Sequence, residues 1–190
     1  MDTSLFRTIN ELQTDSTWLN GLGLFYAKTA GPLLLALLLL VGFAVARRKD
    51  LEHVTRAGWA GLSTFVAVGL NQPIVHAFDR ARPYARLHDV HLLGTPSTDP
   101  SFPSDHATLA GAAIAGLFLV DRRLGWAATA VGLLLCADRV YIGAHYPADV
   151  LAGLTLGAAV ALVGWIVLRR PLVALVTWLA GTRLRPLITA

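Results

Sequence analysis

Cysteine and charged residues are scarce in this chain of 190 residues. Its one cysteine, Cys136, excludes an internal disulfide bond and a cysteine-ligated metal cluster. Charged residues make up 15% of the sequence, whereas a soluble domain typically carries about 25%. Residues 1–17 are polar and lack an apolar core, so we expect no cleavable signal peptide. These absences exclude a disulfide-stabilised scaffold and argue against a soluble globule.

Long apolar runs dominate what is present: 55% of the residues are hydrophobic and the mean hydropathy is +0.57. A helix needs about 20 residues to cross a bilayer, because it rises ~1.5 Å per residue through ~30 Å of hydrocarbon. Five stretches approach or exceed this length, and they cover residues 18–46, 54–78, 104–120, 124–142 and 148–168. We therefore expect an all-α fold, a polytopic membrane helical bundle with five to six spans.

Shorter segments flank these runs. Residues 1–17 carry aliphatic side chains at helical spacing and could form an interfacial helix. Residues 172–180 are too short to cross alone, so we expect a short membrane-associated stretch over 171–190. The first apolar run is longer than a crossing needs, which predicts tilt or a kink near Gly31 and Pro32. We expect residues 1–190 to form a single integral-membrane domain.

Basic residues occur in short knots between apolar runs, at 47–49, 122–123 and 169–170. These knots alternate along the chain, and the positive-inside rule places them in the cytoplasm. Loops 79–103 and 142–147 would then face outward, which predicts a multi-pass protein of the plasma (inner) membrane with an outward-facing active site. The net charge of +4 does not indicate a nucleic-acid partner, because the basic residues form no continuous face.

Four of the six histidines lie in or near the two expected outward loops. Ionisable groups near membrane depth are costly, so they are candidates for function. Ser104 is expected to cap the helix that follows Pro103, and His106 falls in its first turn. Free N–H groups at such a helix start can bind an anion. The alternative interpretation is an ordinary capped helix.

The segment before the fifth run combines Arg139, His145 and Asp149. Pro147 suits the first turn of a helix, which places His145 just before it and Asp149 inside it. The spacing of four lets the carboxylate reach back to the imidazole, fix its tautomer and stabilise its charged form. The guanidinium of Arg139 can hold a phosphate with two hydrogen bonds. A capping aspartate beside a loop histidine is the alternative.

Two further arginines, Arg80 and Arg82, open the long loop and could bind phosphate or lipid headgroups. Together the three segments resemble the type 2 phosphatidic acid phosphatase superfamily. Its pattern is a lysine, six residues and Arg-Pro; then Pro-Ser-Gly-His; then Ser-Arg, five residues, His, three residues and Asp. The resemblance covers about residues 50–165, and the matching positions are Arg82, Pro83, Pro103, Ser104, His106, Arg139, His145 and Asp149.

Three positions depart from that pattern: Val75 replaces the lysine, Asp105 the glycine and Asp138 the serine. Arg80 or His76 could supply the missing positive charge. The Ser-Asp-His-Ala-Thr form of the second segment is similar to the bacterial undecaprenyl-diphosphate phosphatases.

The resemblance implies roles for each matching residue. His145 attacks the terminal phosphorus and forms a phosphohistidine, Asp149 orients it, and His106 protonates the leaving oxygen. The phosphate-binding residues are then Arg82, Arg139, Ser104 and Arg80. No metal and no cofactor are expected, and the partners are a lipid phosphate substrate and membrane lipids.

The implied activity is hydrolysis of undecaprenyl diphosphate to undecaprenyl phosphate. A phosphatidylglycerol phosphate or phosphatidic acid phosphatase is the first alternative. A vanadate-dependent haloperoxidase is the second, since the same residues can hold vanadate, although those enzymes are soluble. A non-enzymatic membrane scaffold or transporter component is the third.

Overall fold

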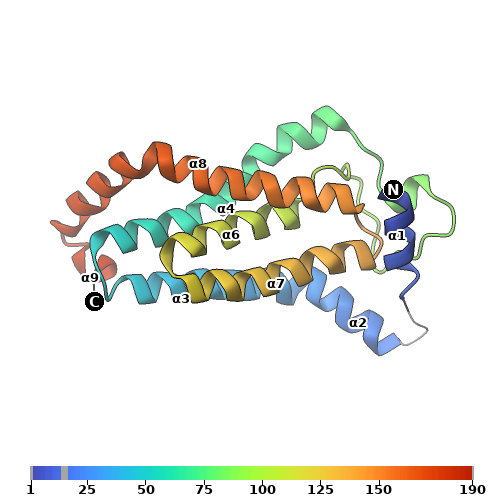
Figure 1. Ribbon diagram of the computed structural model, residues 1–190, viewed down its shortest axis with the longest axis horizontal. Coiled ribbons are helices and arrows are strands. Elements are labelled where there is room, and N and C mark those ends of the chain that lie inside the picture. The colour runs from blue at the N-terminus through green and yellow to red at the C-terminus, as the bar shows by residue number, and fades with distance from the viewer. Residues whose placement is uncertain (1, 14–16, 190) are drawn as a thin grey trace.

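The computed structural model describes residues 2–13 and 17–189, and the regular elements in those ranges are all helices (Figure 1). The all-α expectation is confirmed. Helix α1 (Asp2–Asn10) falls within the segment 1–17 that was expected to form an interfacial helix. Residues 1 and 14–16 of that segment, and residue 190 of the C-terminal stretch, lie outside the described residues.

The first apolar run forms one helical rod of three parts, α2 (Thr17–Phe25), the π-helical turn η1 (Tyr26–Ala30) and α3 (Gly31–Ala46). The irregularity expected near Gly31 and Pro32 is therefore a wide turn just before them. Pro32 has no N–H to donate to the carbonyl four residues earlier, that of Lys28, which favours this wider turn. Gly31 is required here because a Cβ would lie 2.9 Å from a methyl carbon of Leu135.

Four long helices complete the bundle: α4 (Leu51–Phe78), α6 (Asp105–Val120), α7 (Arg122–Tyr141) and α8 (Pro147–Ala180). Helix α6 packs against α3, α4, α7 and α8. Its closest neighbour is α8, because a Cβ on Gly157 would lie 2.0 Å from the carbonyl oxygen of Thr108. Small residues let the two backbones approach, as is usual in membrane bundles.

Within residues 2–13 and 17–189, three helical segments are long and apolar enough to cross a membrane: Thr17–Ala46, Arg122–Tyr141 and Pro147–Ala180. Helix α6 has only 16 residues, and α4 carries more polar side chains, so five to six spans stay a prediction. The prediction that residues 172–180 form a separate segment is wrong, because helix α8 continues through Pro171 to Ala180.

The helices run alternately up and down the bundle, which brings the chemically unusual segments to one end (Figure 1). That end holds α1, the short helix α5 (Pro83–Arg86), and the starts of α6 and α8. The C-terminal helix α9 (Arg185–Ile188) lies at the other end. The basic knots gather there too, where Arg169 forms an ion pair with Glu52.

Candidate active site

A cavity of about 490 Å³ opens where α6 and α8 begin, and it holds four of the residues that the sequence predicts for the site. Arg82 precedes α5, His106 lies in the first turn of α6, and Arg139 lies in the last turn of α7. His145 comes from the short connection between α7 and α8. Loop residues 95–100 form the remaining wall. Segments that lie far apart in the sequence therefore meet in one hollow.

His145 is buried, with 3% of its surface exposed, and both ring nitrogens have neighbours. Nδ1 lies 2.8 Å from the carbonyl oxygen of Ser101. A carbonyl only accepts, so Nδ1 carries the proton and Nε2 keeps its lone pair. Burial and the charges of Arg139 and Arg82 lower the pKa of His145 well below its ordinary value of about 6.5. The imidazole is thus neutral at pH 7, with a nucleophilic nitrogen available.

Asp149 does not form the expected hydrogen bond with His145. Its Oδ2 lies 3.9 Å from Nδ1, and this carboxylate instead accepts hydrogen bonds from the Ser101 hydroxyl, the Arg80 guanidinium and the Tyr146 backbone N–H. The physical reason is that the carbonyl of Ser101 lies nearer to Nδ1 and already satisfies it. Asp149 is therefore linked to His145 through Ser101, whose hydroxyl donates to Asp149 and whose carbonyl accepts from the imidazole.

Two guanidinium groups bring positive charge to the cavity. Arg82 donates through Nε to the carbonyl of Asp99 at 2.7 Å, and its Nη1 lies 3.3 Å from Nε2 of His145. Arg139 is buried, with 7% exposed, and its Nε has no hydrogen-bond partner among the described residues. It also forms no ion pair with a carboxylate in the ranges 2–13 and 17–189. A buried guanidinium in this state is suited to an anion.

Ser104 occupies the N-cap position of α6, as expected, but its side chain makes no capping bond. Its hydroxyl is fully buried and lacks a partner within the part of the chain that the structure describes. The backbone N–H of Ser104 donates to the carbonyl of Asp149, which ties the start of α6 to α8. Asp105, in place of the family glycine, accepts hydrogen bonds from Asn71 and Gln72 of α4. An anion oxygen beside the Ser104 hydroxyl would satisfy it.

Arg80 is not placed to bind phosphate, which corrects that expectation. Its guanidinium forms ion pairs with Asp149 and with Asp2 of α1, and it stacks 4.1 Å over the ring of Tyr146. It does not line the cavity that contains His145. Two carboxylates hold it because α1 folds back over the start of α8 (Figure 1). Its connection to the cavity is through Asp149.

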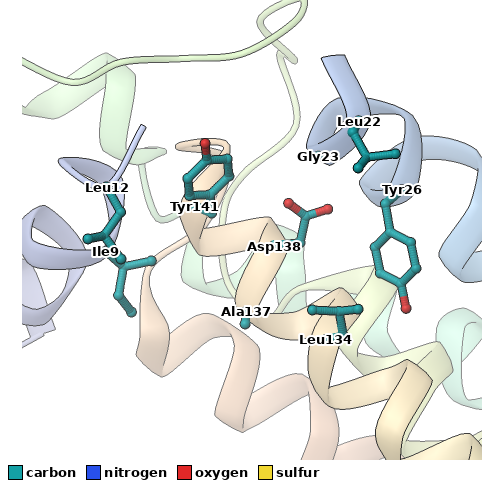
Figure 2. A pocket seen from close by; sticks show the side chains of 9 residues that line it. All are labelled: Ile9, Leu12, Leu22, Gly23, Tyr26, Leu134, Ala137, Asp138 and Tyr141. Carbon is teal, nitrogen blue, oxygen red and sulfur yellow. The ribbon is translucent and has the colours of Figure 1, made fainter. Parts of the chain in front are cut away.

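Asp138, which stands where the family has serine, lies in a different pocket of about 450 Å³. Figure 2 shows its carboxyl group between the rings of Tyr26 and Tyr141, among apolar side chains of α1, α2 and α7. One oxygen, Oδ2, has no hydrogen-bond partner within the described residues. The carboxyl group of Asp138 is thus absent from the lining of the cavity that contains His145.

Lys28 of η1 also lines the active-site cavity, and the sequence analysis did not select it. It was detectable, because Lys28 is the one charged residue within the apolar run 18–46. Val75, at the family lysine position, is buried within α4. His76, the other suggested source of charge, is absent from the lining of the cavity. Among residues 2–13 and 17–189, no group of three or more His, Cys, Asp or Glu side chains is arranged to hold a metal ion.

The PAP2 superfamily profile matches residues 56–171, which include all the cavity arginines and histidines. This chain belongs to the PAP2 superfamily. The family resemblance inferred from the three sequence segments is confirmed.

Several relatives of this PAP2 protein are named as phosphatases. Undecaprenyl-diphosphatase BcrC of Bacillus subtilis (strain 168) is 33% identical over 181 residues, covering 93% of this chain and 90% of the relative. Lipid A 1-phosphatase of Rhizobium johnstonii is 34% identical over 166 residues, covering 82% of this chain and 64% of the relative. The crystal structure of Aquifex aeolicus LpxE superposes with a TM-score of 0.69 at 24% identity, covering 85% and 93% of the two chains. The protein is a PAP2 lipid phosphatase, a hydrolase with a helical membrane fold.

Proposed function

We propose that this PAP2 protein removes the terminal phosphate of an isoprenoid lipid diphosphate, converting undecaprenyl diphosphate to undecaprenyl phosphate. The observation that carries the proposal is His145, a buried neutral imidazole whose unprotonated Nε2 lies 3.3 Å from Nη1 of Arg82, in a cavity that Arg139 also lines. The similarity to a named undecaprenyl-diphosphatase over 93% of the chain supports the choice of substrate.

In the first half-reaction, Nε2 of His145 attacks the terminal phosphorus. A nitrogen–phosphorus bond forms, the bond from phosphorus to the bridging oxygen breaks, and the electron pair leaves on that oxygen. His106, on the facing wall of the cavity, donates a proton to it and then serves as base for the hydrolytic water. Arg82, Arg139 and the hydroxyl of Ser104 stabilise the charge on the equatorial oxygens.

In the second half-reaction, water gives a proton to His106 and its oxygen bonds to phosphorus, while the nitrogen–phosphorus bond breaks and its electron pair returns to Nε2 of His145. These steps use only water and side chains, so the proposed mechanism is metal-independent. The active site would face outward from the plasma membrane, because the basic knots gather at the opposite end of the bundle. A substrate released on the outer surface fits this orientation.

Phosphate release from purified lipid phosphates tests the proposal. The panel contains undecaprenyl diphosphate, phosphatidylglycerol phosphate and phosphatidic acid, each in detergent with and without a magnesium chelator. We expect the diphosphate to be the best substrate, with no effect of the chelator. His145→Ala should abolish release, and Arg139→Ala or His106→Ala should lower it severely. Faster phosphate release from phosphatidylglycerol phosphate or phosphatidic acid would contradict the proposed substrate and would favour that glycerolipid instead.

Two controls distinguish a phosphatase from a haloperoxidase and from a scaffold. Halide oxidation in the presence of vanadate should be absent, since a haloperoxidase would show it. A scaffold would retain its full biological effect as a folded His145→Ala variant, whereas a phosphatase would lose it.

A further inference from the structure

Lys28 is a charged residue inside a helical rod that is otherwise apolar. Within a membrane span an ammonium group requires a charged partner or a wet cavity. No carboxylate within ion-pair distance of Lys28 occurs in the described ranges 2–13 and 17–189. What lies beside it is the cavity that contains His145 and the two guanidinium groups.

Lys28 is exposed, and its side chain is part of the lining of this cavity. The π-helical turn η1 carries Lys28, and turns of this kind often occur at functional sites. Gly94 of the covering loop lies against it, since a Cβ on Gly94 would be 3.1 Å from Nζ and 3.0 Å from a methyl carbon of Leu24. Gly94 has φ +95°, a conformation that favours glycine. The loop is fixed nearby by a hydrogen bond from the N–H of Leu93 to the carbonyl of Ile142.

The three cations of the cavity come from separate parts of the chain. Nη1 of Arg82 lies 3.3 Å from Nε2 of His145, and Arg139 comes from the last turn of α7, just before His145 in the chain. Lys28 projects from another element, η1, which packs against α3 and α7. Two carboxylates, those of Asp99 and Asp105, lie on the same lining, so Lys28 gives it an excess of positive charge. A second phosphate on the substrate would match this excess better than a single phosphate does.

The cavity also has room for a second phosphate. Its volume of about 490 Å³ is many times the ~30 Å³ that one water molecule occupies in the liquid. Of the two acids on its lining, Asp105 already accepts hydrogen bonds from Asn71 and Gln72, and Asp99 accepts one from Ser97. These bonds leave the carboxylate charges in place, but neither acid forms an ion pair with Lys28, Arg82 or Arg139 among the described residues, so the cations remain available for substrate oxygens.

We propose that Lys28 binds the phosphate that stays on the lipid, and that it thereby selects lipid diphosphates over lipid monophosphates. This inference rests on the proposed function. When the bond between the terminal phosphorus and the bridging oxygen breaks, the electron pair passes to that retained phosphate. An ammonium group beside it stabilises the developing charge until His106 delivers the proton.

A substrate comparison tests the selectivity. Lys28→Met, Lys28→Arg and the control Lys49→Met are assayed on a lipid diphosphate and a lipid monophosphate with the same tail. Lys49 is the other lysine of the chain, at the opposite end of the bundle. Lys28→Met should lower the ratio of kcat/KM for diphosphate to that for monophosphate by about 10- to 100-fold, as for loss of a charged hydrogen bond. Lys28→Arg should recover most of this ratio, and Lys49→Met should not change it.

Chemical labelling gives a second measurement that does not depend on turnover. The intact protein in detergent is treated with an amine-reactive reagent, and mass spectrometry follows Lys28 with Lys49 as the internal reference. Inorganic pyrophosphate should protect Lys28 at concentrations at least tenfold lower than orthophosphate does. Equal protection by the two anions, or equal loss on both lipids for Lys28→Met, overturns the role of Lys28.

The two measurements also separate this inference from the proposed function. A wild-type protein that fails to hydrolyse the diphosphate contradicts the proposed function. The labelling experiment then still shows whether Lys28 binds a diphosphate in preference to a single phosphate. A wild-type diphosphatase whose Lys28→Met variant folds and keeps its selectivity contradicts only the inference.

Discussion

Replacement of Asp149 by asparagine separates two ways of orienting the nucleophile. In this structure the carboxylate is fully buried and accepts from Ser101 and Tyr146 on Oδ2 and from Arg80 on Oδ1. An asparagine can accept on one side only, and its NH₂ group then faces another donor. If the NH₂ group faces Arg80, the charged hydrogen bond from Arg80 is lost, and this bond is worth about 1.5–3 kcal/mol.

The magnitude follows from the position of His145 in this network. Its tautomer is fixed by the carbonyl of Ser101, which Asp149→Asn leaves in place. Even if the whole cost appeared in the transition state, kcat would fall by only about 10- to 150-fold. Where a carboxylate itself holds the histidine tautomer, as in serine protease triads, the same change costs about 10⁴-fold.

The assay is a single-turnover measurement of phosphate release, with an alkaline quench to quantify the acid-labile phosphohistidine. Thermal unfolding in detergent is measured in parallel, because loss of a buried acceptor also lowers stability. Asp2→Asn is the matched control, since it removes the other partner of Arg80, in a partly exposed pair worth less than about 1 kcal/mol. A loss near 10⁴ in Asp149→Asn with unchanged stability would refute the indirect arrangement.

Three further predictions concern pH, packing and topology. The pKa of His145 lies below 6.5, so the acid limb of kcat/KM should lie below that pH, and Arg82→Gln, which removes a nearby positive charge, should move the limb to higher pH. Gly157→Ala should lower the free energy of unfolding by at least about 1–3 kcal/mol, because its Cβ meets a backbone oxygen of α6 at 2.0 Å, while Gly58→Ala has open space and should cost nothing. A cysteine introduced within 88–98 should react with an impermeant thiol reagent on intact cells, whereas labelling only after permeabilisation would reverse the orientation.

The meeting of His106, Arg139 and His145 could be predicted from the sequence because each lies at a helix end. In an up-and-down bundle, the start of one helix and the end of the preceding antiparallel one fall at the same end. The family spacing then selected the side chains that are predicted to carry the chemistry. The span count was harder, since α6 is both short and rich in small residues that pack against neighbouring helices.

Long-range partners were beyond the reach of sequence patterns. The spacing of four brought Asp149 to 3.9 Å from the imidazole, yet the nearer acceptor is a backbone carbonyl, that of Ser101, which side-chain patterns do not describe. Arg80 and Arg82 look alike in the sequence. They differ in the structure because Asp2, 78 residues away from Arg80, forms an ion pair with one of them.

The cavity that contains His145 is lined by a buried cation without a partner. Nε of Arg139 has no hydrogen-bond partner among the described residues, and a buried group in this state costs about 1–3 kcal/mol. The hydroxyl of Ser104 is also buried without a partner in the part of the chain that the structure describes, but Ser104 is absent from the lining of this cavity. An anionic phosphate is a ligand that satisfies a guanidinium N–H. Binding of the transferred phosphoryl group is therefore favoured by the same unpaired N–H of Arg139 whose burial lowers the stability of the fold.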